Sequence, residues 1–197
     1  MVDSGGQFEA NCFIDLIAHS SFSQSDIHGL PNHNGGFANL QGGRMGVEIE
    51  RKFLVKGNGW RTNLGTVIGQ GYLNRDKNRT IRVRIAGDQA FLTIKGPSVG
   101  ASRLEYEYAI PTRDGLELLQ LCEGTPISKT RHVVDIEGMK WEIDEFHGVN
   151  DGLVVAEIEL DTEDQAFALP DWIDREVTDD PRYFNSNLIE HPFSKWC

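Results

Sequence analysis

The residues of this 197-residue chain that could do chemistry are charged side chains that recur in pairs two positions apart. On an extended strand, side chains two apart point to the same side, so each pair faces one way while its apolar neighbours face the other. The carboxylates in such positions are Glu48, Glu50, Glu105, Glu107, Glu142, Asp144, Glu157 and Glu159. The cations are Lys52, Arg82, Arg84, Lys95, Lys129 and Arg131.

The pairing of like charges favours a shared site over a set of solvated surfaces. On one strand a polar face turned to water is the simpler interpretation, but close like charges repel unless a counter-charge or ligand lies between them. Carboxylates are ligands for Mg²⁺ or Mn²⁺, and Lys and Arg bind phosphate oxygens. A polyphosphate with a bound divalent metal satisfies both sets. A bare metal store would not need the cations, and a bare anion site would not need the acids.

The elements that must position these residues are mainly strands. Alternation of polar and apolar residues predicts strands at 47–55, 69–73, 80–85, 90–95, 103–110, 128–136, 139–146 and 153–160. Helices are expected at 113–122, at 162–167 with a Thr-x-x-Gln capping box, and at 185–190. The fold class is therefore α+β with a mainly antiparallel sheet. A barrel of about eight strands would place the charged faces around one small ligand, with the helices packed outside.

Composition limits the function classes. Thirty acidic against 19 basic residues give a net charge of −11, which argues against a non-specific nucleic-acid binder. Cys12, Cys122 and Cys197 lack any CxxC spacing, so neither a disulfide framework nor a thiolate zinc site is indicated. No apolar run is long enough for a membrane span and no signal peptide is recognisable. We expect a cytoplasmic protein without nucleic-acid or membrane partners; a homodimer remains open.

The chain divides near Met45. Residues 1–44 are rich in Gly, Ser and Asn with a single short apolar stretch, which is typical of a disordered leader or an extension upstream of the natural start. Strand-like alternation begins directly after Met45. We therefore expect the folded domain to span 45–197.

The order of the charged motifs resembles that of the CYTH, or triphosphate tunnel metalloenzyme, superfamily. It starts with the ExExK motif Glu48-Ile49-Glu50-Arg51-Lys52 and continues over essentially all of 46–197. The further motifs are Gln70-Gly71-Tyr72-Leu73, Arg82-x-Arg84, Leu92-Thr93-Ile94-Lys95-Gly96, Arg103-x-Glu105-Tyr106-Glu107, Lys129-x-Arg131, Trp141-Glu142-Ile143-Asp144, Glu157-Ile158-Glu159-Leu160 and Glu176-Val177-Thr178-x-Asp180-x-Arg182-Tyr183. The bacterial inorganic tripolyphosphatase-type branch is the most similar.

This resemblance implies an eight-stranded closed tunnel with a charged interior, which hydrolyses tripolyphosphate to pyrophosphate and phosphate with Mg²⁺ or Mn²⁺. It implies that Glu48, Glu50, Asp144, Glu157 and Glu159 bind metal, supported by Glu105, Glu107 and Glu142. The implied phosphate-binding residues are Lys52, Arg82, Arg84, Lys95, Lys129, Arg131 and Arg182. The implied catalytic residues are Glu50, Lys52, Tyr72 and Lys129, with Tyr72 and Lys129 as a proton-transfer pair.

Three other functions fit the same residues. A class IV-type adenylyl cyclase or a hydrolase of nucleoside or thiamine triphosphate would use the same tunnel, and a non-catalytic module could bind polyphosphate or nucleotides. The sequence contains no feature that demands a base pocket. The complete sets of acids and cations argue against a simple binder, because a binder does not need so many metal ligands.

Overall fold

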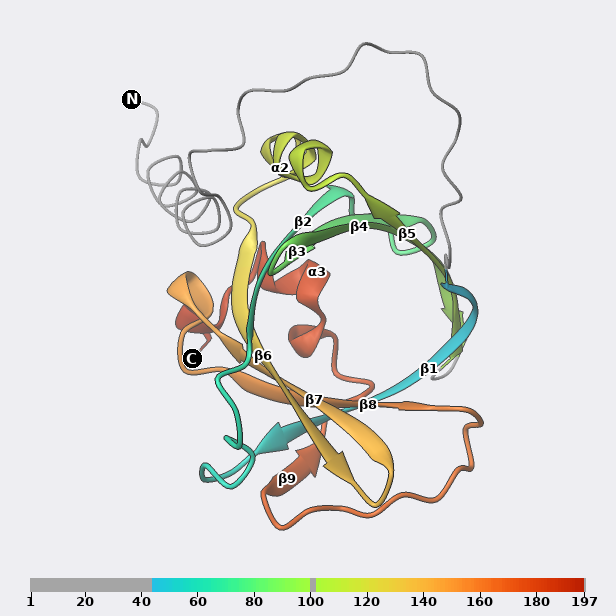
Figure 1. Ribbon diagram of the computed structural model, residues 1–197, viewed down its shortest axis with the longest axis vertical. Helices are drawn as coiled ribbons and strands as arrows, with labels where there is room; N and C mark the ends of the chain where they lie inside the picture. The colour runs from blue at the N-terminus through green and yellow to red at the C-terminus, as the bar shows by residue number, and fades with distance from the viewer. Residues whose placement is uncertain (1–43, 100–101, 197) are drawn as a thin grey trace.

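The computed structural model describes residues 44–99 and 102–196 (Figure 1). The leader expected at 1–44 falls, except for Arg44, outside the described residues, so the domain boundary stays a prediction. None of the helices in the described ranges has the length and apolar character that crossing a bilayer requires.

Within the described residues the chain forms nine strands, and every pairing between neighbours is antiparallel. All eight expected strands are confirmed, and β9 is an addition. The strands are β1 (Arg44–Val55), β2 (Thr66–Asn74), β3 (Thr80–Ala86), β4 (Gln89–Val99), β5 (Ser102–Ile110), β6 (Ile127–Ile136), β7 (Met139–Phe146), β8 (Val154–Leu160) and β9 (Ile173–Glu176). A mainly antiparallel sheet with few helices is therefore confirmed.

Strand β1 has two partners, and this decides the shape of the sheet. Its first half pairs with β5, with Glu48 opposite Arg103, and its second half pairs with β8, with Lys52 opposite Glu157. The hydrogen-bonded order runs β5-β4-β3-β2-β6-β7-β8-β1, with β9 beyond β1. The sheet consequently curls around an interior, as Figure 1 shows.

Helix α2 (Thr112–Gln120) confirms the helix expected at 113–122 and packs outside β2, β3 and β4 (Figure 1). Gly71 on β2 permits this approach, because a Cβ there would lie 2.7 Å from the Cβ and Sγ of Cys122 at the end of the helix. The remaining helical segments are short. They are α3 (Asn185–Leu188) and the 3-10 turns η1 (Gly148–Asn150), η2 (Pro181–Tyr183) and η3 (Phe193–Lys195).

The helix expected at 162–167 is wrong, because the chain makes only one turn there. Gln165 Oε1 accepts a hydrogen bond of 2.6 Å from the backbone N–H of Asp161, one residue before the Thr162 N–H that a capping box would engage. A segment this short cannot sustain a helix without packing along its whole length. Here Phe167 instead packs edge-on against Phe53 and Trp141.

The two sides of the sheet carry different cores. Outside, Trp60, Trp141 and Trp172 pack with Phe53 and neighbouring aliphatic side chains. A second cluster occupies one end of the interior, where the inward-facing Leu54, Phe146 and Val155 pack with Leu188 of α3. The expectation that the helices pack outside therefore holds for α2, whereas α3 covers one end of the interior and is seen within the curled sheet in Figure 1.

Candidate active site

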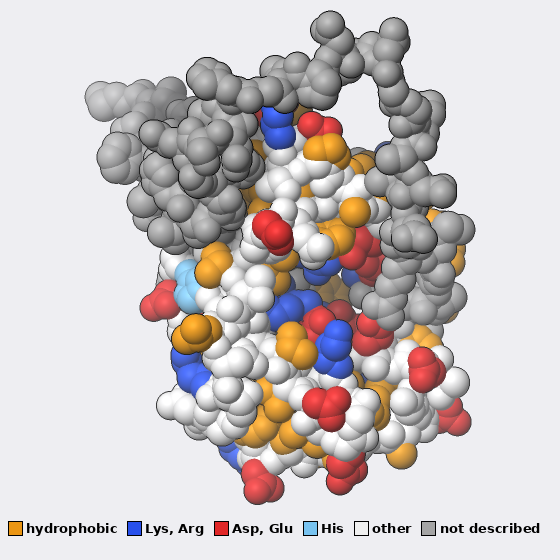
Figure 2. Space-filling view, in the orientation of Figure 1, with side chains coloured by type: hydrophobic (Ala, Val, Ile, Leu, Met, Phe, Trp, Pro, Cys, Tyr) orange, Lys and Arg blue, Asp and Glu red, His pale blue; other side chains and the backbone are white. Residues whose placement is uncertain are grey.

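The interior of the curled sheet contains a cavity of about 610 Å³ that is lined mainly by charged residues. Figure 2 looks into it and shows blue and red side chains gathered in the hollow. Among the described residues, eight carboxylates and seven cations line it. They are Glu50, Glu105, Glu107, Glu142, Glu157, Glu159, Asp161 and Asp179, and Lys52, Arg82, Arg84, Lys95, Arg103, Arg131 and Lys140.

One side of the cavity, which we name the β3–β5 wall, holds one group of contacts around Glu107, which pairs with Arg84 and at 3.4 Å with Arg82, and a second ion pair between Lys95 and Glu105. The Arg84 guanidinium donates to both carboxylate oxygens of Glu107, at 3.0 and 2.9 Å, and the Thr93 hydroxyl donates to the same carboxylate at 2.9 Å. Lys95 Nζ lies 2.7 Å from Glu105 Oε2. Arg84, Glu107, Lys95 and Glu105 all line the cavity, so both ion pairs are in contact with the space that a ligand would fill, whereas Thr93 is buried behind them.

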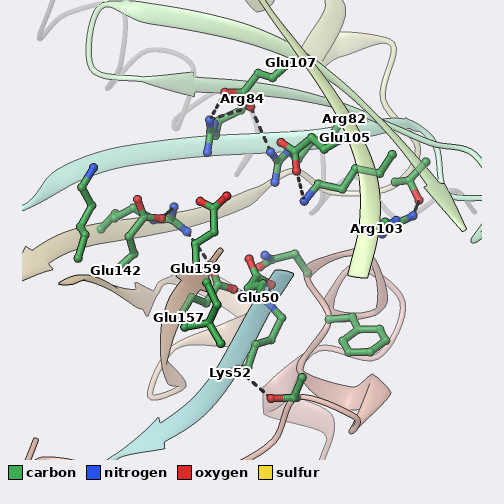
Figure 3. Close-up of a pocket in the computed structure, with 18 of the residues that line it drawn as sticks. Glu50, Lys52, Arg82, Arg84, Arg103, Glu105, Glu107, Glu142, Glu157 and Glu159 are labelled. Atoms are coloured by element: carbon green, nitrogen blue, oxygen red, sulfur yellow. Dashed lines mark hydrogen bonds and ion pairs between the residues drawn. The ribbon is translucent and has the colours of Figure 1, made fainter. Parts of the chain in front are cut away.

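The opposite side, the β6–β1 wall, holds a continuous chain of ion pairs. Lys52 Nζ bonds to Glu50 and, at 2.5 Å, to Glu157. The second oxygen of Glu157 accepts from Arg131 at 3.1 Å, and Arg131 also bonds to Glu142 and, through two nitrogens at 2.7 and 2.6 Å, to Asp144. The chain ends at Lys129, whose Nζ lies 2.5 Å from Asp144. Figure 3 shows Glu50, Glu157 and Glu159 together on this side, facing Arg82, Arg84 and Glu107.

Burial and pairing act in opposite directions on this wall. Burial alone would raise the pKa of Glu157, but Lys52 and Arg131 outweigh it and hold that pKa well below its usual range. Burial likewise opposes the charge of Lys52, yet Glu157 and Glu50 raise its pKa. For Lys129 burial wins over Asp144 and lowers the pKa to about 8. Glu157 and Lys52 are therefore charged at neutral pH, and Lys129 loses its proton more easily than Lys52.

Tyr72 reaches the cavity from β2. Its hydroxyl accepts a long hydrogen bond of 3.5 Å from Gln70 Nε2, and burial raises its pKa. The charges that act on it most are those of Arg82 and Lys52. Tyr72 is thus a neutral hydroxyl between the two walls.

Comparison with known proteins agrees with this architecture. The CYTH domain family model matches residues 46–190. The chain is 51% identical to an inorganic triphosphatase of Acetivibrio thermocellus over 154 residues, which cover 77% of this chain and 99% of that relative. It is 37% identical to an inorganic triphosphatase of Nitrosomonas europaea over 146 residues, 72% of this chain and 96% of the relative. This chain belongs to the CYTH family. A crystal structure of an inorganic triphosphatase matches the structure of this chain with a TM-score of 0.52 and 35% sequence identity, over 72% of this chain and 93% of that one.

Most of the charged residues expected at the site of this CYTH domain do line the cavity. The structure brings together Glu50, Lys52, Tyr72, Arg82, Arg84, Lys95, Glu105, Glu107, Arg131, Glu142, Glu157 and Glu159. Asp144 and Lys129 are not among the lining residues; each side chain is 1% exposed and they pair with one another behind Arg131. Arg182 also lies away from the lining, on the surface, where it pairs with Asp180. The side chain of Glu48 lies outside the described residues.

The sequence reasoning missed several lining residues of the CYTH domain. Arg103 and Lys140 point inward because they share strand parity with Glu105 and with Glu142, so the alternation rule applied one step further would have found both. Arg103 donates to Thr80 Oγ1 at 2.7 Å and to the carbonyl of Gly96 at 2.5 Å. These bonds hold the beginning of β3 against the irregular part of β4.

The C-terminal segment also contributes to the lining, through Thr178 and Asp179 of the motif at 176–183 and through residues 184–186 that follow it. Thr178 accepts a hydrogen bond of 3.0 Å from the backbone N–H of Lys52, and its hydroxyl donates to Glu176 at 2.6 Å. The backbone N–H of Val177 donates to the carbonyl of Lys52 at 2.8 Å. Because this segment bonds to both the backbone N–H and the backbone carbonyl of Lys52, it fixes the strand that carries Glu50 and Lys52.

The carboxylates of this site fit a divalent cation that shares its coordination with a ligand. In the described part of the chain no three acidic, His or Cys side chains converge into a ready metal cage. Magnesium commonly binds through one or two carboxylates and completes its shell with water and substrate phosphates. Glu50, Glu157 and Glu159 supply hard oxygen donors on one wall, opposite the arginines that could hold the phosphates. The donor set suits Mg²⁺ or Mn²⁺ rather than a softer metal.

Proposed function

We propose that this protein hydrolyses inorganic tripolyphosphate to pyrophosphate and phosphate in a reaction that depends on Mg²⁺ or Mn²⁺. The CYTH membership and the curated relatives named inorganic triphosphatases support the substrate class. The single observation that carries the proposal is the balanced lining of eight carboxylates and seven cations. A strongly anionic ligand gains little in such a cavity alone, whereas a metal-bound triphosphate matches both sets of charges.

We propose that the curled sheet works as a closed tunnel of eight strands. The pairing of β1 with both β5 and β8 supports this, because it joins the two ends of the strand order. A tunnel holds its charged side chains on rigid strands, which preorganises them for a ligand before it arrives. The apolar cluster around Leu54, Phe146 and Leu188 would then direct the substrate to the opposite end.

The residues divide into three tasks. Arg82, Arg84, Lys95 and Arg131 would bind phosphate oxygens, Arg in two-pronged fashion and Lys as a point charge. Glu50, Glu157 and Glu159, together with Glu48, would hold the metal. The bound metal would neutralise charge on the triphosphate and polarise its phosphorus–oxygen bonds.

Lys52 and Tyr72 would act closest to the reaction. Lys52 already bonds to Glu50 and Glu157, and it would bind a phosphate oxygen when those carboxylates turn to the metal. One of the same carboxylates would orient a water in line with the terminal phosphorus. Tyr72 is neutral because its pKa is raised, so its hydroxyl would donate a hydrogen bond to the substrate.

For the residues that do not line the cavity we propose positioning roles. Asp144 accepts two hydrogen bonds from Arg131, and Lys129, which is buried on the side away from the cavity, donates a further hydrogen bond to Asp144. Both would act on the substrate through Arg131 rather than by contact. Arg182 would stabilise the C-terminal segment, since its guanidinium packs over Tyr183 and Trp196.

Phosphate release tests the proposal. Tripolyphosphate, ATP and pyrophosphate would be compared with Mg²⁺ or Mn²⁺, with a chelator as control. Fast, chelator-sensitive release from tripolyphosphate is expected, with little from ATP. Release from organic triphosphates alone, formation of cyclic AMP, or tight tripolyphosphate binding without release would each contradict the proposal and favour the corresponding alternative.

A further inference from the structure

Lys140, at the beginning of β7, lines the cavity and is also exposed to solvent, so we take it as a residue of the cavity mouth. It shares strand parity with Glu142 and lines the cavity together with Gly138 and Met139 of the same hairpin. The turn before it is tight, since Glu137 and Gly138 both have positive φ, at 55° and 82°. Such a two-residue turn fixes the register of the hairpin. The backbone of Lys140 is therefore held at the rim, although its side chain is exposed.

Lys140 differs from every other cation of the cavity in its bonding. In the described ranges it is the one lining cation whose side chain makes no hydrogen bond or ion pair. Asp135 lies opposite it in register, but that carboxylate accepts the backbone N–H of Gly138 at 2.9 Å. The other six cations are engaged. They are Lys52, Arg82, Arg84, Lys95, Arg103 and Arg131.

The rim around Lys140 is held in place by the loop after β8. Gln165 Nε2 lies 3.9 Å from Met139 Sδ, next to Lys140, while Gln165 Oε1 accepts the backbone N–H of Asp161 at 2.6 Å. Both Asp161 and Gln165 line the cavity. The loop therefore contacts the β6–β7 hairpin at Met139, directly before Lys140, and helps to hold Lys140 at the entrance.

A free cation at the entrance has a different energetic role from a paired one inside. Five of the six engaged cations have a carboxylate partner, and exchange of that partner for a phosphate opposes the first contact. Lys140 can bind an anion without breaking any bond. Charges at the rim of a site act mainly on the rate of association and on its dependence on salt.

We propose that Lys140 is the capture residue of the enzyme, which binds the incoming triphosphate before the inner cations exchange partners. The proposal rests on the proposed function, because it assumes a triphosphate substrate. It predicts that Lys140 contributes to kcat/KM and little to kcat, since the inner residues complete the site once the substrate is bound. It also predicts that the contribution declines as salt is added.

The test compares Lys140→Gln with Lys56→Gln, which removes an equally exposed lysine just after β1 that does not line the cavity. Steady-state hydrolysis of tripolyphosphate would be measured at low and at physiological ionic strength. We expect Lys140→Gln to lower kcat/KM by roughly threefold to tenfold at low salt and to flatten its salt dependence, as for charges at the rim of a binding site. Lys140→Arg should restore most of the rate, and Lys56→Gln should match the wild type.

The outcomes separate this proposal from the function it rests on. Equal kcat/KM in Lys140→Gln and Lys56→Gln, with active wild type, would overturn the capture role alone. A loss confined to kcat would also overturn it, because it would place Lys140 in the chemical step or in folding. Absence of tripolyphosphate turnover in the wild type would overturn both proposals.

Discussion

The two walls of the cavity carry the same kinds of side chain but arrange them differently. On the β3–β5 wall Arg84 and Lys95 have separate carboxylate partners, Glu107 and Glu105. On the β6–β1 wall one chain of contacts runs from Glu50 to Lys129. Its inner end is 1% exposed, whereas the pair of Arg84 and Glu107 keeps 17% and 18% of its side-chain surface.

This difference separates residues that can change partners from residues that cannot. A pair open to the cavity can give its cation to a phosphate while water or metal satisfies the carboxylate. A charge buried inside a chain has no such substitute, and removal of its partner leaves it unsatisfied. We therefore expect the β3–β5 wall to determine binding and the inner part of the β6–β1 wall to determine stability.

The largest expected effect is loss of stability in Asp144→Asn. This change leaves Lys129 and Arg131 without their shared carboxylate in a buried position, and should cost about 3–5 kcal/mol of the free energy of unfolding. The matched change Glu107→Gln on the β3–β5 wall should cost only about 1–2 kcal/mol. Urea denaturation of both variants measures the difference, and equal losses would remove the distinction between the walls.

The second effect concerns activity rather than stability. Glu159 is exposed, lines the cavity and is one of the proposed metal ligands. Glu159→Gln should therefore lower the rate of metal-dependent turnover by on the order of 100-fold. Its free energy of unfolding should change by less than about 0.5 kcal/mol. Phosphate release and urea denaturation test the two parts, with Glu117→Gln on α2 as control because Glu117 is exposed and outside the cavity. Full activity of Glu159→Gln would remove Glu159 from the proposed metal ligands.

The sequence alone predicts most of the residues of both walls, because inward-facing and outward-facing side chains alternate along each strand. Alternation in 80–85 and 103–110 predicts that Arg82, Arg84, Glu105 and Glu107 share one side, and the cavity contains all four. Parity does not report depth along the strand. Asp144 and Glu142 share a face on β7, yet only Glu142 reaches the cavity.

What fixes depth is a contact far away in the chain. The C-terminal segment places Leu188 on the inward-facing Phe146 and Val155, and this covers the end of the interior nearest Lys129. No local pattern connects 177–188 with β7 and β8. The wrong helix prediction at 162–167 also results from a contact distant in sequence. Phe167 packs against Trp141 in the outer aromatic cluster, and the local capping signal does not predict this contact.

The third effect is weaker substrate binding in Arg84→Ala. Arg84 faces the cavity and its partner Glu107 is partly exposed, so the variant should fold while it loses one two-pronged phosphate contact. We expect KM for tripolyphosphate to rise about tenfold with a smaller change in kcat. Arg113→Ala is the control, since Arg113 also pairs with a glutamate but lies on the outside of α2. An unchanged KM would show that Arg84 does not bind the substrate.

The smallest effect is a pH dependence that belongs to the β6–β1 wall. The pKa of Glu157 lies below its ordinary value of 4.5 in the folded protein, so the unfolded chain binds more protons than the native one at acid pH. The stability that ionised Glu157 supplies is therefore complete above about pH 4.5 and declines as the pH falls.

Glu157→Gln isolates this contribution, since Gln carries no charge at any pH. The difference in free energy of unfolding between wild type and variant should be constant from pH 6 to about pH 5 and should shrink below pH 4.5, because there the unfolded wild-type chain takes up a proton at Glu157 that the native protein does not. Urea denaturation at each pH measures it. A difference that stays constant down to pH 3 would mean that Glu157 contributes by packing and not by its charge, and the β6–β1 wall would then differ from the β3–β5 wall in burial alone.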